Sequence, residues 1–252
     1  MRIVVAGGTG LIGTRVVDRL AAAGHDVIAA SRATGVNTYT GEGLAVALAG
    51  ADVVVDTTNS SYTDEAAALE FFYGSTLNLL SHGRAAGVGH HVALSVVGTE
   101  RLAESEGGYF AAKAQQERLI RASGSAFTIV HATQFFEFLH SIADDATRAG
   151  IVRLSRALIQ PMAADDVAAA VVSTVSMPPA GTIVEFAGPE QFRLEDLVRR
   201  QLLLGSDPRE VVADPLARYF GTRLDERELL PGEGATLAAT RFDEWLVQAN
   251  GG

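Results

Sequence analysis

The chain of 252 residues contains no cysteine, which excludes a disulfide framework and a thiolate metal site. It also lacks any run of about 18 uncharged apolar residues, so no membrane-spanning helix is expected. Basic residues are scarce, with 20 Lys and Arg against 30 Asp and Glu and a net charge of −10. Nucleic-acid binding relies on clustered Lys and Arg, so neither a nucleic acid nor a membrane is an expected partner.

The remaining composition is that of a folded protein. Hydrophobic residues make up 48% of the chain and charged residues 20%, which is enough apolar material for a sizeable core. The N-terminus runs directly into an apolar strand pattern without a basic region and cleavage site, so we expect a cytoplasmic location. The length suits one α/β unit with a small appended lobe.

A glycine-rich turn follows the first apolar run, residues 3–6, and precedes a helical pattern over residues 11–23. Gly8, Gly10 and Gly13 fit the G-x-G-x-x-G spacing. Glycine lets the backbone approach a pyrophosphate closely, and the N-terminus of the helix attracts that anion. The alternative is a strand–helix turn that is glycine-rich without binding anything. We predict a dinucleotide site at Gly7, Gly8, Thr9, Gly10, Leu11, Ile12 and Gly13.

The end of the second expected strand, residues 27–30, bears on the choice of cofactor. Ser31 and Arg32 stand where an acidic residue would bind the ribose 2′-hydroxyl of NAD. An arginine there accommodates the 2′-phosphate of NADP instead, although a solvated loop arginine fits the sequence as well. The sequence therefore favours NADP(H) over NAD(H).

Strands and helices alternate at short spacing, which predicts an α/β fold with a doubly wound, Rossmann-like parallel sheet. Residues 1–131 are expected to form the dinucleotide-binding core. Residues 132–252 are expected to complete the sheet and form a small C-terminal substrate-binding lobe, within one compact unit. Thr57, Thr58 and Asn59 follow the strand at 51–56 and are expected beside the adenine or ribose, or as ordinary turn residues. Further strands are expected at 36–39, 88–97, 127–130 and 183–186, an extended segment at 153–161, helices at 43–49, 64–87, 109–123, 141–149, 165–175 and 194–204, and short helices from there to the C-terminus.

Ser95, Tyr109 and Lys113 form a second candidate group. Tyr109 and Lys113 are one turn apart on the same face of the expected helix. An ammonium there would lower the pKa of the phenol and also bind the nicotinamide ribose. The tyrosine could then exchange a proton with a carbonyl or hydroxyl oxygen, which Ser95 could also hydrogen-bond. The structural alternative is that Tyr109 is a half-buried aromatic residue and Lys113 a solvated lysine beside it.

With these motifs the chain resembles the short-chain dehydrogenase/reductase superfamily. The resemblance rests on the glycine turn, Ser31, Arg32, Ser95, Tyr109 and Lys113, and it implies Tyr109 as catalytic acid/base assisted by Ser95 and Lys113. Within the superfamily the chain looks most like the atypical NmrA-like branch. The similar segments are residues 93–98, 112–113 with Glu117, 123–124, 132–138, 160–162 and 165–168. His131 departs from the arginine that relatives commonly carry there.

Several further residues have both a functional and a structural interpretation. His90, His91 and His131 lack an accompanying carboxylate cluster at ligand spacing, so we expect structural or surface histidines and no metal. Aromatic residues at this density are more often core, so only part of the phenylalanine cluster is expected to line a site. The expected substrate pocket comprises Gln134, Phe135, Phe136, Phe138 and Gln160.

The sequence thus predicts an NADPH-dependent oxidoreductase that reduces a carbonyl, or oxidises an alcohol, of an apolar small molecule. One alternative is an NmrA-like NADP-sensing regulator that binds the cofactor without turnover. A second is an NAD(P)H quinone or azo reductase; nucleotide-sugar epimerisation is disfavoured because little chain follows residue 131. Relatives often form homodimers through helices flanking the sheet, but the sequence does not decide the oligomeric state.

Overall fold

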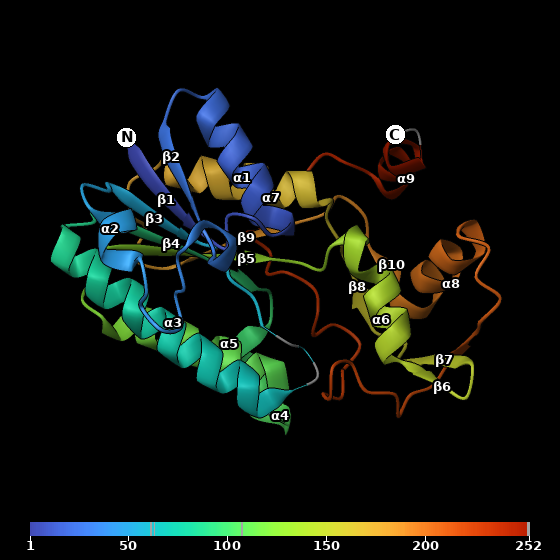
Figure 1. Cartoon of the computed structure of the whole chain (residues 1–252). Helices are drawn as coiled ribbons and strands as arrows, with labels where there is room; N and C mark the ends of the chain where they lie inside the picture. Colours follow the sequence, from blue (N-terminus) through green and yellow to red (C-terminus); the bar gives the residue numbers. More distant parts are fainter. Residues whose placement is uncertain (61, 63, 107, 251–252) are drawn as a thin grey trace.

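The computed structural model describes residues 1–60, 62, 64–106 and 108–250. Its centre is a seven-stranded sheet in the order β12-β9-β5-β4-β3-β1-β2, and every neighbouring pair is parallel. The strands are β1 (Arg2–Ala6), β2 (Asp26–Ala30), β3 (Val53–Asp56), β4 (His90–Val96), β5 (Phe127–Ala132), β9 (Ile183–Ala187) and β12 (Thr236–Leu237). The predicted doubly wound α/β fold is confirmed (Figure 1).

Helices cover both faces of this sheet, as buried parallel strands require (Figure 1). Alternate residues of β1 enter two different cores: Ile3 and Val5 join the core under α1 (Leu11–Ala22) and α7 (Ala164–Val175). Val4 and Ala6 join the opposite core under α2 (Leu44–Leu48) and α3 (Glu65–Ala86). On that second face α3 packs against α5 (Gly108–Ala122), which also contacts α4 (Thr99–Glu106).

The C-terminal half contributes both to the sheet and to a separate group of elements beside it (Figure 1). Strands β9 and β12 extend the central sheet beyond β5. The separate group is built on α6 (Leu139–Asp145), β6 (Thr147–Arg148), β7 (Ile151–Leu154), β8 (Leu158–Ile159), β10 (Phe192–Arg193), α8 (Leu194–Leu204), β11 (Glu210–Ala213) and α9 (Phe242–Asn250). Its aromatic core includes Phe136, Phe242 and Trp245.

Three expected elements differ from the structure. Residues 36–39 form a turn rather than a strand, because the Asn37 side chain accepts a hydrogen bond from the Tyr39 N–H at 3.1 Å. The helix expected at 141–149 ends at Asp145, and Ala149 and Gly150, both at positive φ, turn the chain into the β6–β7 hairpin. In residues 205–250 one helix, α9, and the strands β11 and β12 replace the expected short helices.

Among the described residues, no helix is long and apolar enough to cross a membrane.

Candidate functional site

A cavity of about 1200 Å³ opens beyond the carboxyl ends of strands β1 to β5. It exceeds the roughly 300–1,000 Å³ of typical small-molecule sites, which leaves room for more than one ligand group. Open α/β sheets bind ligands at this edge. Predicted site residues that line it are Gly7, Thr9, Gly10, Leu11, Ile12, Ser31, Arg32, Thr57, Thr58, Asn59, Ser95, Tyr109, Lys113, Gln134, Phe135 and Phe138.

The glycine turn fits a close approach by a ligand backbone. Gly7 has a φ of +76°, and a Cβ there would lie 2.9 Å from the Thr57 carbonyl carbon. A Cβ on Gly13 would lie 2.1 Å from the Gly7 oxygen, so only glycine lets α1 start against the turn. Gly10 caps α1 without a side chain, which leaves the first N–H groups of the helix without an intrahelical partner. This is the donor set that a pyrophosphate needs.

The neighbouring part of the cavity is formed by the turns after β2 and β3. Arg32 is exposed, and among the described residues its guanidinium has no hydrogen-bond or ion-pair partner. By contrast, the hydroxyl groups after β3 are committed locally. Thr57 Oγ1 donates to the Ala6 carbonyl at 2.8 Å, and Thr58 Oγ1 donates to Asp56 at 2.6 Å.

Tyr109 lies deep in the cavity wall, with 5% of its surface exposed. Its hydroxyl donates to Asn59 Oδ1 at 2.8 Å. Burial raises the pKa of Tyr109 well above 10, and the neighbouring Tyr62 and Tyr219 raise it further. The expectation that Lys113 lowers this pKa is therefore wrong: the phenol keeps its proton at neutral pH.

Lys113 is the sole lysine of the chain, and it is buried beside Tyr109 in the cavity wall. Its Nζ donates to the Leu94 carbonyl at 2.8 Å and to Gln116, and it lies 4.6 Å from the centre of the Phe72 ring. Burial lowers the pKa of Lys113 to about 8, while the charge of Asp56 acts in the opposite direction.

Gln116 links that lysine to Asp56, since its Nε2 donates to Asp56 Oδ2 at 2.9 Å. Neither Asp56 nor Gln116 was expected in the site from the sequence. The only local signal for them was the position of Asp56 at the end of a strand and of Gln116 one turn beyond Lys113.

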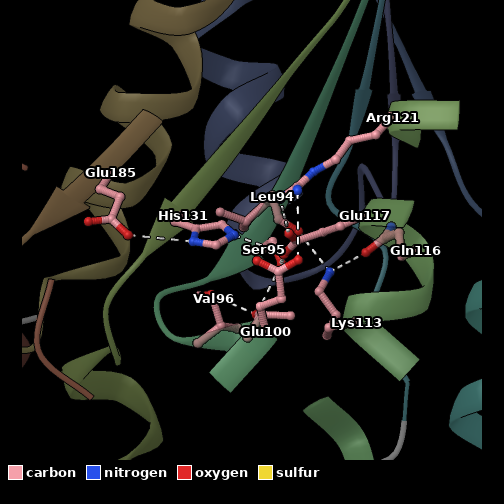
Figure 2. Close-up of polar contacts among 11 residues, drawn as sticks. Leu94, Ser95, Val96, Glu100, Lys113, Gln116, Glu117, Arg121, His131 and Glu185 are labelled. Carbon is pink, nitrogen blue, oxygen red and sulfur yellow. Dashed lines mark hydrogen bonds and ion pairs between the residues drawn. The ribbon is translucent and has the colours of Figure 1, made fainter. Parts of the chain in front are cut away.

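A chain of buried polar groups lies behind Ser95 (Figure 2). Ser95 Oγ donates to Glu117 Oε1 at 2.6 Å, and His131 Nε2 donates to the same oxygen at 2.8 Å. His131 Nδ1 lies 3.7 Å from Glu185 Oε1 on the neighbouring strand. Arg121 Nη2 contacts the other Glu117 oxygen at 3.3 Å.

The two central groups of this chain stabilise each other's charge. Burial acts to raise the pKa of Glu117, but the hydrogen bonds from His131 and Ser95 lower it below 4.5. Burial acts to lower the pKa of His131, but Glu117 and Glu185 raise it above 6.5. His131 was expected to be a structural or surface histidine, and its partner Glu117 entered the sequence analysis only as part of a family resemblance.

The remaining cavity wall is aromatic and comes from distant segments. The Tyr62 ring centre lies 4.6 Å from that of Tyr109 and 4.9 Å from that of Phe220. The segment after β11 also supplies Tyr219, which the sequence analysis missed together with Tyr62 and Phe220. No short pattern marks these residues, because only the fold brings them together.

Four predicted residues lie elsewhere. Phe136 is buried against Phe242 and Trp245, and Gln160 donates to the Gly188 carbonyl at 2.7 Å outside the cavity lining. The turn glycines Gly8 and Gly13 support the cavity without lining it. Phe136–Phe138 form a short 3₁₀ helix with three residues per turn, so Phe135 and Phe138 face the cavity and stack at 5.3 Å, whereas Phe136 points the other way.

The other predicted histidines are engaged in the sheet. His90 Nε2 is 2.9 Å from Thr128 Oγ1, and burial lowers the pKa of both His90 and His91. Within the described part of the chain, no group of three His, Asp or Glu side chains is arranged to hold a metal ion.

The sequence pattern of a family described as NAD(P)H-binding matches residues 7–178. No curated protein sequence matches the chain. Among solved structures, the chain is similar to DesIV, a dTDP-glucose 4,6-dehydratase from Streptomyces venezuelae with NAD and TYD bound. The TM-score is 0.74 at 21% identity, over 98% of this chain and 95% of that one.

Two epimerase structures are similar as well. The UDP-glucose 4-epimerase of Thermus thermophilus, in complex with NAD, has a TM-score of 0.67 at 18% identity, over 100% of this chain and 93% of that one. The UDP-glucose 4-epimerase of Thermotoga maritima, with UDP-glucose, has a TM-score of 0.69 at 16% identity, over 92% of this chain and 90% of that one. At these identities the likeness concerns the fold.

Proposed function

This chain belongs to the NAD(P)H-binding family, and from that premise we propose that it is an NADPH-dependent oxidoreductase. Its substrate is the carbonyl, or in reverse the alcohol, of an apolar small molecule. One observation carries this proposal. The glycine turn, Arg32, Tyr109 and Lys113 line a single cavity whose remaining wall is aromatic.

The residues of the turn suit the cofactor. The uncapped N-terminus of α1 would hold the pyrophosphate, and the backbone of Gly7 permits its close approach. The nicotinamide, when bound, supplies or accepts the hydride. The guanidinium of Arg32 at the end of β2, which has no partner among the described residues, is the group that would bind a 2′-phosphate, which is why we propose NADP(H) over NAD(H).

Tyr109 is the proposed proton donor. Because its pKa lies well above 10, the phenol carries the proton that a carbonyl oxygen needs as it becomes a hydroxyl. Lys113, with a pKa of about 8, provides a buried positive charge near neutral pH one turn away. That charge would hydrogen-bond the ribose of the cofactor.

The aromatic wall supports an apolar substrate. The similar dehydratase and epimerases act, by their names, on nucleotide sugars, and such ligands need many polar partners. Here the rings of Tyr109, Phe138 and Phe220 pack around Tyr62 instead. A flat, apolar carbonyl compound or quinone suits these rings better.

A second candidate is an NmrA-like regulator that binds NADP without turnover. It is favoured by the commitment of both candidate hydroxyl groups within the chain: Tyr109 donates to Asn59, and Ser95 donates to Glu117. A protein that only senses the cofactor has no need of a free proton donor.

The test combines binding with turnover. Fluorescence titration with NADPH and NADH is followed by a panel of apolar ketones and quinones monitored at the NADPH absorbance. We expect tighter NADPH binding, turnover of at least one ketone, and a loss of about 10²- to 10⁴-fold in Tyr109→Phe with unchanged NADPH affinity.

Tyr73→Phe, which removes the hydroxyl of an exposed tyrosine on α3, is the matched control and should keep full turnover. Tight NADPH binding without turnover of any compound would favour the regulator. Turnover of quinones alone, unaffected by Tyr109→Phe, would favour the quinone or azo reductase.

A further inference from the structure

Ser95 presents an oxygen without its proton to the cavity. A hydroxyl group has one proton to donate, and Ser95 Oγ directs it to Glu117 Oε1 at 2.6 Å. Glu117 accepts from His131 and Arg121 as well, so its two oxygens act as acceptors and the direction of the Ser95 bond is determined (Figure 2). What Ser95 offers a ligand is therefore a lone pair.

Thr99 does not change this direction. Its Oγ1 lies 3.5 Å from Ser95 Oγ, but it donates its own proton to the Val96 carbonyl at 2.6 Å. With both protons committed, neither hydroxyl serves as a donor to the other. A ketone oxygen, which only accepts, would find no donor at Ser95. The role that the sequence analysis expected for Ser95 thus does not follow from this geometry.

Gln134 supplies the second observation. Its side chain is 6% exposed and lines the same cavity, yet neither its Nε2 nor its Oε1 has a hydrogen-bond partner among the described residues. Its backbone is held in place, since the Met162 N–H donates to the Gln134 carbonyl at 2.8 Å. A buried amide without partners destabilises the fold, so this one points to a ligand that supplies them.

Ser95 and Gln134 stand at the ends of adjacent strands. Ser95 lies in β4 opposite His131 of β5, and Gln134 follows the end of β5. Together they offer an acceptor, from Ser95, and both a donor and an acceptor, from the Gln134 amide. The complement of this set is a group that carries an N–H donor and a carbonyl acceptor side by side.

We propose that Ser95 and Gln134 bind a carboxamide group in the cavity, with the amide N–H donating to Ser95 Oγ and the amide oxygen accepting from Gln134 Nε2. Glu117 is the positioning residue, because it holds the Ser95 proton away from the ligand, and His131 holds Glu117. The inference rests on the proposed function, which supplies one carboxamide: that of the nicotinamide ring. The other source is an amide on the substrate.

The first arm measures equilibrium binding of NADP⁺ and of its 3-acetylpyridine analogue by fluorescence quenching or calorimetry. The two differ only in that a methyl group replaces the amide nitrogen, so the analogue cannot donate to Ser95. We expect NADP⁺ to bind wild type about 3- to 10-fold more tightly. This ratio should fall to about one in Ser95→Ala. It should fall less in Glu117→Gln, because the amide oxygen of the glutamine can still accept the Ser95 proton. Gln134→Leu should weaken both dinucleotides about equally.

The second arm addresses the substrate. Benzamide carries a carboxamide on an apolar ring and is titrated into the NADP⁺-loaded protein by ligand-observed NMR. If wild type binds both dinucleotides equally but binds benzamide, and Ser95→Ala and Gln134→Leu each weaken benzamide binding about 3-fold or more, the substrate is the source of the amide.

Gln160→Leu is the control for removing a buried glutamine. Gln160 donates to Gly188 outside the cavity, so its loss should lower the melting temperature without changing the dinucleotide ratio. The inference is wrong, while the proposed function stands, if wild type binds the two dinucleotides equally and benzamide binding is absent or unaffected by Ser95→Ala and by Gln134→Leu. Absence of NADP⁺ binding overturns the proposed function together with it. Melting curves of Ser95→Ala, Glu117→Gln and Gln134→Leu identify a variant that fails to fold, and the remaining variants then decide.

Discussion

The two ends of the cavity are built in different ways. At the glycine turn the binding groups are backbone atoms of one short segment, residues 7–13, whose positions follow from local sequence. At the other end the binding groups are side chains from α5, the end of β5 and the segment around Tyr219, which only long-range packing brings together. A motif therefore describes the first end almost completely and the second end only in part.

Among the substitutions discussed, Gly13→Ala is expected to disrupt the backbone-built end of the cavity most strongly. The new Cβ would lie 2.1 Å from the Gly7 oxygen, so the turn and α1 must separate. We expect a loss of about 3 kcal/mol or more in the free energy of unfolding and roughly 100-fold weaker NADPH binding, measured by urea unfolding and fluorescence titration. Gly234→Ala, at a position outside the positive-φ region where no described atom lies within 4 Å of the added Cβ, is the control for adding a methyl group. Unchanged NADPH affinity in Gly13→Ala would show that the turn does not hold the cofactor.

Two neighbouring phenylalanines test how the side-chain-built end of the cavity is assembled. Phe136→Ala removes a fully buried ring from the Phe242–Trp245 cluster and should cost about 3–5 kcal/mol of stability. Phe135→Ala removes a ring that lines the cavity, so it should raise the KM for an apolar substrate with a smaller loss of stability. Unfolding curves and steady-state kinetics separate the two effects. The reverse assignment, with KM sensitive only to Phe136, would contradict the placement of these rings.

Arg32 tests whether a side chain adds specificity to the backbone-built end. Arg32→Ala should weaken NADPH binding about 10-fold, since a charged hydrogen bond to the 2′-phosphate is lost, and leave NADH binding unchanged. Arg84→Ala removes the same charge from an exposed position near the end of α3 and should change neither affinity. If the two dinucleotides weaken equally in Arg32→Ala, the preference for NADP(H) does not come from this residue.

The smallest expected effect concerns the buried pair behind Ser95. The pKa of His131 is raised above 6.5, so its charge stabilises the fold fully below pH 6.5, and this contribution is lost as the pH rises through the raised value. The pKa of Glu117 is lowered below 4.5, so its contribution persists above pH 4.5 and is lost as the pH falls through the lowered value.

His131→Gln should therefore be less stable than wild type by about 1 kcal/mol at pH 6, and the difference should shrink toward pH 9. Urea unfolding at several pH values measures it, and the double variant with Glu117→Gln isolates the interaction between the two side chains. A deficit that is the same at pH 6 and pH 9 would mean that the charge of His131 does not contribute.

The sequence predicted the parallel sheet and most of its helices because apolar strands and amphipathic helices carry local periodic patterns. The turn at 36–39 was mistaken for a strand because Val36 and Tyr39 favour strands, whereas the Asn37 side chain determines the turn. In the site, Gly13, Tyr109 and Lys113 follow from spacing along one segment. Glu117 was visible only as part of a family resemblance, and its contact with Ser95 depends on the packing of α5 against β4.

The aromatic wall lies beyond what spacing can predict. Tyr62 and Phe220 are far apart in sequence, and their rings meet only because the chain after β11 returns to the opening of the cavity. The difference between Phe135 and Phe136 depends on backbone direction at the isolated bridge from Phe135 to Met162.

The strand order also bears on how the protein is made. β5 pairs with β4 on one side, but its other partner, β9, is encoded some fifty residues later, and β12 follows after a further interval. During synthesis, β5 therefore remains an edge strand with unpaired backbone groups until Ile183–Ala187 has left the ribosome. The contact of His131 with Glu185 forms across this later pairing, so the polar chain behind Ser95 is complete only after β9 has joined the sheet.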